Sequence, residues 1–293
     1  MAYTTTQLLA NINRRNFAPT GQTTYSTADI LAIADEEFRT LLLPEILSVR
    51  EEFFVDYVDY SLVASQGGYD IPDRAVGMII REIKYYDASG LVTDLNRMEP
   101  EDLDHISQES SKPVSFYVQN NQIMLHRIPS SSSGTIRVWF FIRAGDLIKA
   151  SSAAVVSAIN TTTNVVTVSS IPSTWATADI FDLIKGTGGQ EYLAFDSTSI
   201  LVSGNDITFS SLPARLKVGD YVSPQEQSPL LQMPYEYRDV LAQATATFIM
   251  ENMNIPGVDK AKAKLANMIV GARDLVVPRT QGSPRTVLPA SWI

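Results

Sequence analysis

The pattern of hydrophobic residues divides this chain into three parts. Helix-like and strand-like patterns alternate up to about residue 150, short strand-like runs fill residues 150–226, and helical spacing returns after that. Near the N-terminus the apolar positions repeat as on one face of a helix: Ile30, Ala34, Phe38, Leu41 and Leu42. Ser26 and Asp29, three residues apart, predict a capping box at the start of this helix. Pro44 lacks a backbone N–H, so it should kink or end the helix.

The segment from residue 53 to residue 142 predicts strands. Aromatic and β-branched residues favour strands over 53–60 and 78–86. Residues 114–118 and 122–127 flank Asn120-Asn121, a pattern typical of a β-hairpin, and 135–142 adds a third strand to a small meander. Residues 98–106 predict a short helix with a proline in its first turn.

Residues 150–226 are dominated by Ser, Thr, Val, Ile and Gly. Short strand-like runs separated by turn residues predict a small all-β barrel or sandwich. Helical spacing returns over 234–253 and 260–275, on either side of Ile255-Pro256-Gly257. We therefore expect an α+β fold, with a helical core that includes a small β-meander and an inserted all-β barrel or sandwich domain.

This organisation predicts five segments along the chain. They are an N-terminal arm (1–25), the first part of the core (26–149), the inserted β domain (150–226), the C-terminal helices of the core (227–276) and an extended C-terminal arm (277–293).

Composition narrows the possible functions. The formal net charge of −9 argues against binding nucleic acid over the whole surface, because phosphate binding needs clustered Lys and Arg. The absence of cysteine excludes disulfides, thiol catalysis and Cys-ligated metals. No run approaches the roughly 18 apolar residues of a membrane span. We expect a soluble protein that is made and used without export.

Residues with catalytic or metal-binding potential are scattered. Neither His105 nor His126 has a partner at ligand spacing, and the glycines of 186–189 are not followed by the Lys of a phosphate-binding loop. Four carboxylates cluster in the first turn of the expected helix, where acids favour the helix dipole: Glu99, Glu101, Asp102 and Asp104. We predict no enzyme activity, no metal and no cofactor; a cell-wall hydrolase that uses these carboxylates remains an alternative.

The C-terminal arm combines three prolines, two arginines and an apolar end. Prolines reduce the conformational entropy that an extended segment loses when it docks, and such a segment suits insertion into a partner's groove. A disordered terminus is the alternative. The predicted partner-binding residues are Pro278, Arg279, Arg285, Val287, Leu288, Trp292 and Ile293.

The order of these elements resembles a known family. A capped helix and strands are followed by Pro113-Val114-Ser115-Phe116-Tyr117-Val118, then by Gln122-Ile123-Met124-Leu125 and Ile136-Arg137-Val138-Trp139-Phe140, and later by helices introduced by Pro234. Over residues 26–148 and 228–277 this resembles the head-to-tail adaptor (connector) proteins of tailed bacteriophages.

The resemblance implies a structural protein of the virion. Such adaptors form a ring, usually a dodecamer, that joins the portal of the head to the tail and lines the DNA channel used during ejection. Implied partners are the portal protein, tail, nozzle or fibre proteins and further copies of the chain, with DNA only in passage and no membrane. The implied location is the head–tail interface, after assembly in the host cytoplasm, and 277–293 would be the portal-docking arm.

A second hypothesis assigns the function to the inserted β domain. It would be a binding module of a phage tail or baseplate that recognises a partner protein or a glycan. Its aromatic residues fall mostly at core-like strand positions: Trp175, Phe181, Tyr192, Phe195, Phe209 and Tyr221.

Overall fold

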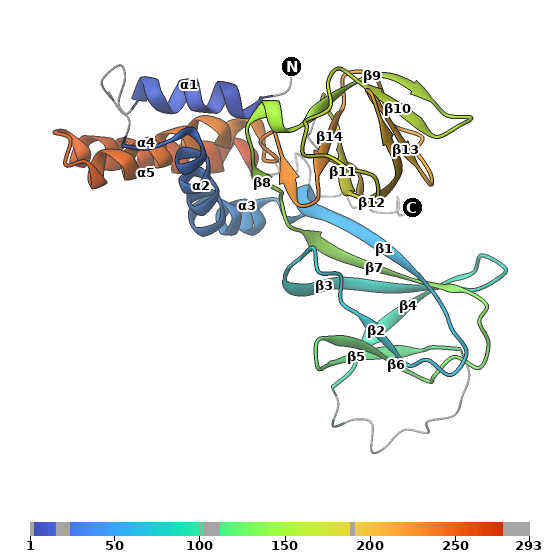
Figure 1. Ribbon diagram of the computed structural model, residues 1–293. Coiled ribbons are helices and arrows are strands. Elements are labelled where there is room, and N and C mark those ends of the chain that lie inside the picture. Colours follow the sequence, from blue (N-terminus) through green and yellow to red (C-terminus); the bar gives the residue numbers. More distant parts are fainter. Residues whose placement is uncertain (1–2, 16–23, 100, 102–111, 188–190, 278–293) are drawn as a thin grey trace, which may run out of the picture. The chain divides into compact units, whose positions relative to one another are not determined.

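A computed structural model describes residues 3–15, 24–99, 101, 112–187 and 191–277. Its internal contacts divide the chain into two compact units (Figure 1). Unit 1 comprises Met1–Arg50 and Gly145–Ile293, and unit 2 comprises Glu51–Ala144. None of the described helices is long and apolar enough to cross a membrane.

The helices of unit 1 pack around one central helix, α4. This helix is buried along most of its length, and α1, α2 and α5 all contact it. Its buried threonines bond within the helix: Thr245 Oγ1 donates to the Leu241 carbonyl at 3.0 Å and Thr247 Oγ1 to the Gln243 carbonyl at 2.7 Å. The helices are α1 (Thr5–Arg15), α2 (Thr27–Glu37), α3 (Leu43–Val49), α4 (Arg238–Asn252) and α5 (Val258–Val276).

The predicted start of α2 is confirmed, and the helix is irregular just before Pro44 without ending there. Ser26 and Asp29 form the reciprocal capping box. A π-helical turn, Phe38–Leu42, follows α2, and α3 begins with Pro44 in its first turn. The wider turn accommodates a residue that cannot donate a backbone hydrogen bond to the preceding turn.

Residues 154–224 of unit 1 form a closed β-barrel. The strands are β9 (Ala154–Asn160), β10 (Val165–Val168), β11 (Ile180–Ile184), β12 (Tyr192–Ser203), β13 (Asp206–Phe209) and β14 (Tyr221–Pro224), in the order β10-β13-β12-β11-β14-β9. Alternate side chains, including Val166, Leu183 and Phe209, fill the interior. At the two ends of this segment, β8 (Asp146–Leu147) pairs in parallel with β15 (Gln227–Ser228).

Unit 2 is a seven-stranded sheet. Its strands are β1 (Val55–Ser61), β2 (Gly68–Asp70), β3 (Ala75–Tyr86), β4 (Val92–Arg97), β5 (Ser115–Gln119), β6 (Gln122–His126) and β7 (Thr135–Ile142), in the order β1-β7-β3-β4-β5-β6-β2. The predicted hairpin is confirmed as β5–β6. Asn120 and Asn121 between its strands both have positive φ, as a type I′ turn requires.

The predicted fold class, an α+β fold with a helical core, is wrong. Among the described residues the structure is mostly β, with the seven-stranded sheet, the closed barrel and short helices. The expected small meander does not stand alone, because β7 pairs with β1 and β3 rather than with the β5–β6 hairpin. Pairing between strands that are distant in sequence leaves no local pattern, so the residue patterns predict single strands but not the seven-stranded sheet that they form. The helix expected at 98–106 lies mostly outside the described residues.

Candidate assembly surface

Helix α5 is the least buried of the described helices of unit 1. Ala272 and Val276 are the buried residues of its 19. Contacts with α4 and α3 anchor one side of the helix. Two ion pairs support this placement: Lys262 reaches Glu251 of α4 at 2.7 Å, and Arg273 reaches Glu45 of α3 at 3.5 Å.

The exposed side of α5 carries two large apolar side chains. Val270 is 60% exposed and Leu275 is 71% exposed. The exposed apolar and small residues of α5 spread over about half of its circumference, and exposed polar side chains such as Asn267 and Asp274 lie among them. We name these apolar and small residues the outer face of α5: Ala263, Ala266, Val270, Gly271 and Leu275. Large exposed apolar side chains on a helix are compatible with a surface that another protein covers.

Gly271 lies inside α5, where glycine is unfavourable by about 1 kcal/mol relative to alanine. A Cβ atom added at Gly271 would meet no described atom within 4 Å. The packing of this chain therefore does not require a glycine here. Close approach of a second backbone to the helix would require one, because the interaxial distance of packed helices depends on the side chains at the contact.

The predicted portal-docking residues, all within 278–293, lie outside the described residues. Their role stays a prediction. The described chain ends at Val277, one residue beyond α5, so the arm continues directly from the helix that carries the apolar outer face.

The other candidate groups do not gather into a site. His126 is buried in β6, and its Nδ1 atom has no hydrogen-bond partner among the described atoms; His105 lies outside the described residues. Glu99 and Glu101 are described, but Asp102 and Asp104 are not. Within the described ranges, no three His, Cys, Asp or Glu side chains are placed to hold a metal ion.

Gly186 serves the barrel rather than a phosphate site. Its N–H donates to the buried carboxylate of Asp220 at 2.9 Å. A Cβ atom at this position would collide with the backbone carbonyl of Gly219, so only glycine fits. β11 and β12, on either side of this segment, pair antiparallel, as the two strands of a hairpin do.

The sequence comparisons identify no relative for this chain: no family model matches it, and no curated protein matches its sequence.

The outer face of α5 was not predicted from the sequence. The spacing of Ile30 to Leu42 predicts the buried face of a helix. The same reasoning applied to residues 260–275 predicts a helix rich in Ala and Lys, and it does not predict which apolar side chains stay exposed. The signal that could have revealed the face is the position of Val270, Gly271 and Leu275, which lie off the stripe that packs on α4.

Proposed function

We propose that this chain is a structural protein of a tailed-phage virion. Copies of the chain form a ring that connects the portal of the head to the tail and surrounds the DNA channel. Two features support the proposal: the resemblance in the order of elements, and the exposed apolar side chains Val270 and Leu275 of α5. The second carries the proposal, because these two side chains remain exposed in the folded chain.

The partner of the outer face of α5 is a second copy of the chain. A contact between this face and a different surface of the neighbouring copy is heterologous, and heterologous contacts close into rings when the rotation between copies permits. Val270 and Leu275 enter the interface, and the small residues Ala263, Ala266 and Gly271 let the neighbour approach the helix backbone.

The energetics favour assembly on a template. Complete burial of an apolar side chain contributes about 1.5 to 3 kcal/mol. Two such residues supply less than the several kcal/mol that association loses in translational and rotational freedom. Copies of the chain therefore associate weakly in free solution and form a ring when a portal ring holds them side by side. The C-terminal arm, by docking on the portal, supplies the additional contact.

Removal of the arm tests the proposal. Deletion of 278–293 leaves unit 1 and unit 2 folded, because every described element of both units ends before residue 278. The truncated protein keeps the circular dichroism spectrum of the full chain and no longer binds the portal ring in sedimentation. Portal binding of undiminished strength by the truncated protein would contradict the docking role of the arm.

A hollow at the rim of the barrel supports the second candidate, a binding module for a glycan or a partner protein. It measures about 610 Å³, and its polar lining includes Asp179, Gln225 and Gln227. The Trp175 ring also lines this hollow and packs on Phe181 of the barrel core at a centroid distance of 4.7 Å. A glycan array probed with the full chain tests this function. Binding that Gln227→Ala removes would favour it over the adaptor, and an array without signal would exclude the glycan.

A further inference from the structure

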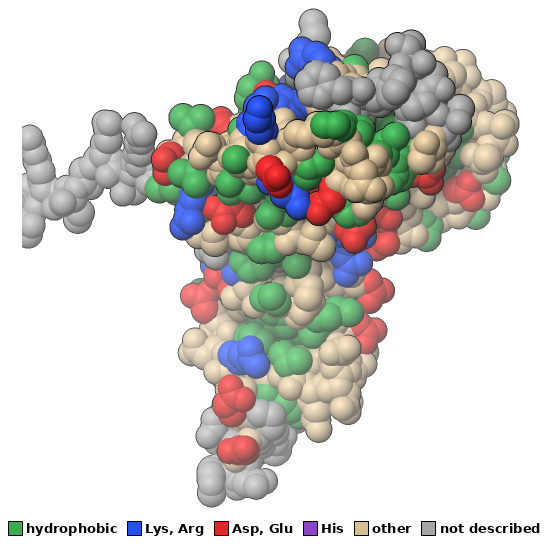
Figure 2. All heavy atoms as spheres, turned by 90° about the vertical axis from the view of Figure 1, so that its left-hand side faces the viewer, with side chains coloured by type: hydrophobic (Ala, Val, Ile, Leu, Met, Phe, Trp, Pro, Cys, Tyr) green, Lys and Arg blue, Asp and Glu red, His purple; other side chains and the backbone are tan. Residues whose placement is uncertain are grey.

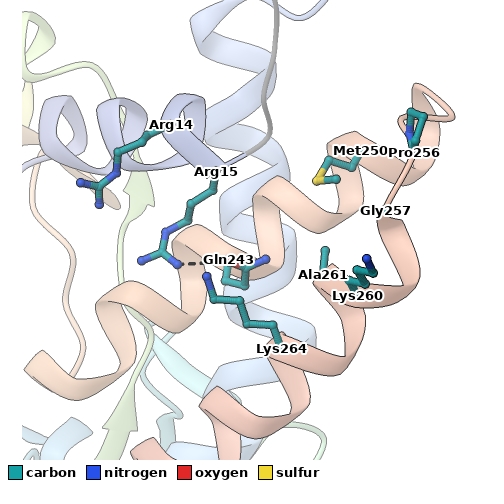
Figure 3. Close-up of a pocket in the computed structure, with 9 residues that line it drawn as sticks. All are labelled: Arg14, Arg15, Gln243, Met250, Pro256, Gly257, Lys260, Ala261 and Lys264. Atoms are coloured by element: carbon teal, nitrogen blue, oxygen red, sulfur yellow. Dashed lines mark hydrogen bonds between the residues drawn. The ribbon is translucent and has the colours of Figure 1, made fainter.

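A pocket of about 520 Å³ lies where the end of α1, the body of α4 and the start of α5 meet (Figure 3). Arg14 and Arg15 contribute from the last turn of α1, and Gln243 contributes from α4. Lys260 and Lys264 contribute from the first two turns of α5. A volume of this size is typical of a small-molecule site.

Four cationic side chains line this pocket, and its described lining contains no acidic side chain. The protein as a whole has a net charge of −9, so the cluster is a local exception. Figure 2 shows the face of unit 1 at which these helices end, with several Lys and Arg side chains near the top of the view. In Figure 3 the side chains of Arg15 and Lys264 extend from α1 and α5 toward Gln243. Cations that share a pocket repel one another unless an anion lies among them.

Arg15 is held in place with donor capacity to spare. Its side chain is 15% exposed, and its guanidinium donates to Gln243 Oε1 at 3.1 Å and to Asp239 Oδ1 at 2.7 Å. Its Nε atom is buried and has no hydrogen-bond partner among the described residues. The bonds to Gln243 and Asp239 fix the guanidinium beside the pocket that Arg15 lines.

The helix dipoles explain the positions of only two of the four cations. Arg14 and Arg15 lie in the last turn of α1, where the dipole favours positive charge. Lys260 lies in the first turn of α5, where the dipole disfavours positive charge, and Lys264 lies one turn further on. Neither lysine has an ion-pair partner in the described part of the chain. Gly257, which lines the pocket, precedes α5, and no side-chain cap bonds the first N–H groups of this helix.

We propose that this pocket binds phosphate groups. The Arg15 guanidinium and the Lys264 ammonium, with Arg14 and Lys260 at the edges of the pocket, match an anion with several oxygens and more than one charge, which describes a chain of phosphates better than a single carboxylate. The phosphates can come from a free polyphosphate compound, such as a nucleotide, or from a nucleic-acid backbone. The inference rests on the pocket alone and does not require the ring.

Isothermal titration of the full chain with inorganic triphosphate tests this site. Lys264→Gln removes an unpaired cation without disturbing the fold, and we expect it to weaken binding about tenfold, the effect of one charge-assisted contact. Lys260→Gln combined with Lys264→Gln weakens binding further. Lys262→Gln is the matched control: it removes the same charge from the same helix, outside the pocket lining, and should weaken binding less than about threefold.

A second titration with a short DNA duplex distinguishes the two sources of phosphate. A duplex that binds and displaces triphosphate supports the site and assigns it to a nucleic-acid backbone. Triphosphate that binds alone supports the site and assigns it to a free polyphosphate compound. The proposal is overturned if neither ligand binds the wild-type protein at low salt, or if Lys262→Gln weakens binding as much as Lys264→Gln does.

Discussion

The Oδ2 atom of Asp35 accepts a 2.7 Å hydrogen bond from the backbone N–H of Leu147, and this bond joins α2 to β8. Burial raises the pKa of Asp35 to about 7, and the neighbouring charge of Asp146 acts in the same direction. The N–H of Leu147 and the guanidinium of Arg39 oppose the shift without cancelling it. A carboxyl group at a structural joint of unit 1 therefore titrates near neutral pH.

The stability of unit 1 should depend on the protonation of Asp35. An unfolded Asp has a pKa near 3.9, so the protonated folded state is favoured below about pH 4, and this contribution is lost as pH rises through 7. Asp35→Asn removes the titration and should raise the free energy of unfolding at pH 8 by about 2 to 4 kcal/mol. Urea denaturation at pH 5 and pH 8 measures the effect, with Glu36→Gln as the control from the same helix. A variant with the same pH dependence as the wild type would contradict the role of Asp35.

Asp220 should be essential to the barrel. Its buried carboxylate accepts hydrogen bonds from the N–H groups of Gly186 at 2.9 Å and Lys217 at 2.7 Å. Asp220→Ala leaves both donors without a partner and should lower the free energy of unfolding by about 2 to 4 kcal/mol. Asp206→Ala, at an exposed barrel position where the carboxylate accepts from Thr167 Oγ1, is the control and should cost less than about 1 kcal/mol. Equal losses in the two variants, measured by denaturant titration, would refute this assignment.

Substitution of Gly271 should raise the stability of the isolated chain and lower the yield of assembled rings. Gly271→Ala adds a methyl group that meets nothing in the described chain and improves helix propensity, so the isolated protein gains about 0.5 to 1 kcal/mol in thermal unfolding. The same methyl group obstructs the close approach of a neighbouring copy and reduces the yield of rings assembled on the portal. If the yield of rings rises together with stability, the outer face of α5 is not the contact.

Leu275 should matter only in the assembled state. Because its side chain is 71% exposed, Leu275→Glu changes the stability of the isolated chain by less than about 0.5 kcal/mol. It places a charge in the proposed interface and should abolish ring assembly on the portal. Val218→Glu, at a barrel position that is 65% exposed, is the matched control and leaves assembly unchanged. Equal ring yields from both variants, counted in electron micrographs, would argue against the interface.

The sequence predicted individual helices and strands better than it predicted which strands pair with one another. Ser26 and Asp29, and the Asn120-Asn121 turn, act through neighbours a few residues away, so their patterns are visible locally. The pairing of β7 with β1 is not local: Arg137 Nε donates to Asp59 Oδ1 at 2.7 Å across strands far apart in sequence. The residues around Asp59 and around Arg137 do not predict that these two strands pair. The large sheet was therefore not predicted, and a helical core was predicted instead.

The pocket and the outer face of α5 could not be predicted from the sequence for the same reason. The phosphate pocket joins Arg15 near one end of the chain to Lys264 near the other, so only the folded helices bring the two cations together. The outer face of α5 is recognised because Val270 and Leu275 remain exposed after packing, which periodicity alone does not reveal.

The mass of the purified protein in solution, measured by light scattering alone and after mixing with the portal ring, tests the central claim most directly. We predict a monomer alone and a single large complex of fixed stoichiometry with the portal, in which several copies of the chain bind each portal ring. A protein that stays monomeric with every portal ring tested would contradict the adaptor function.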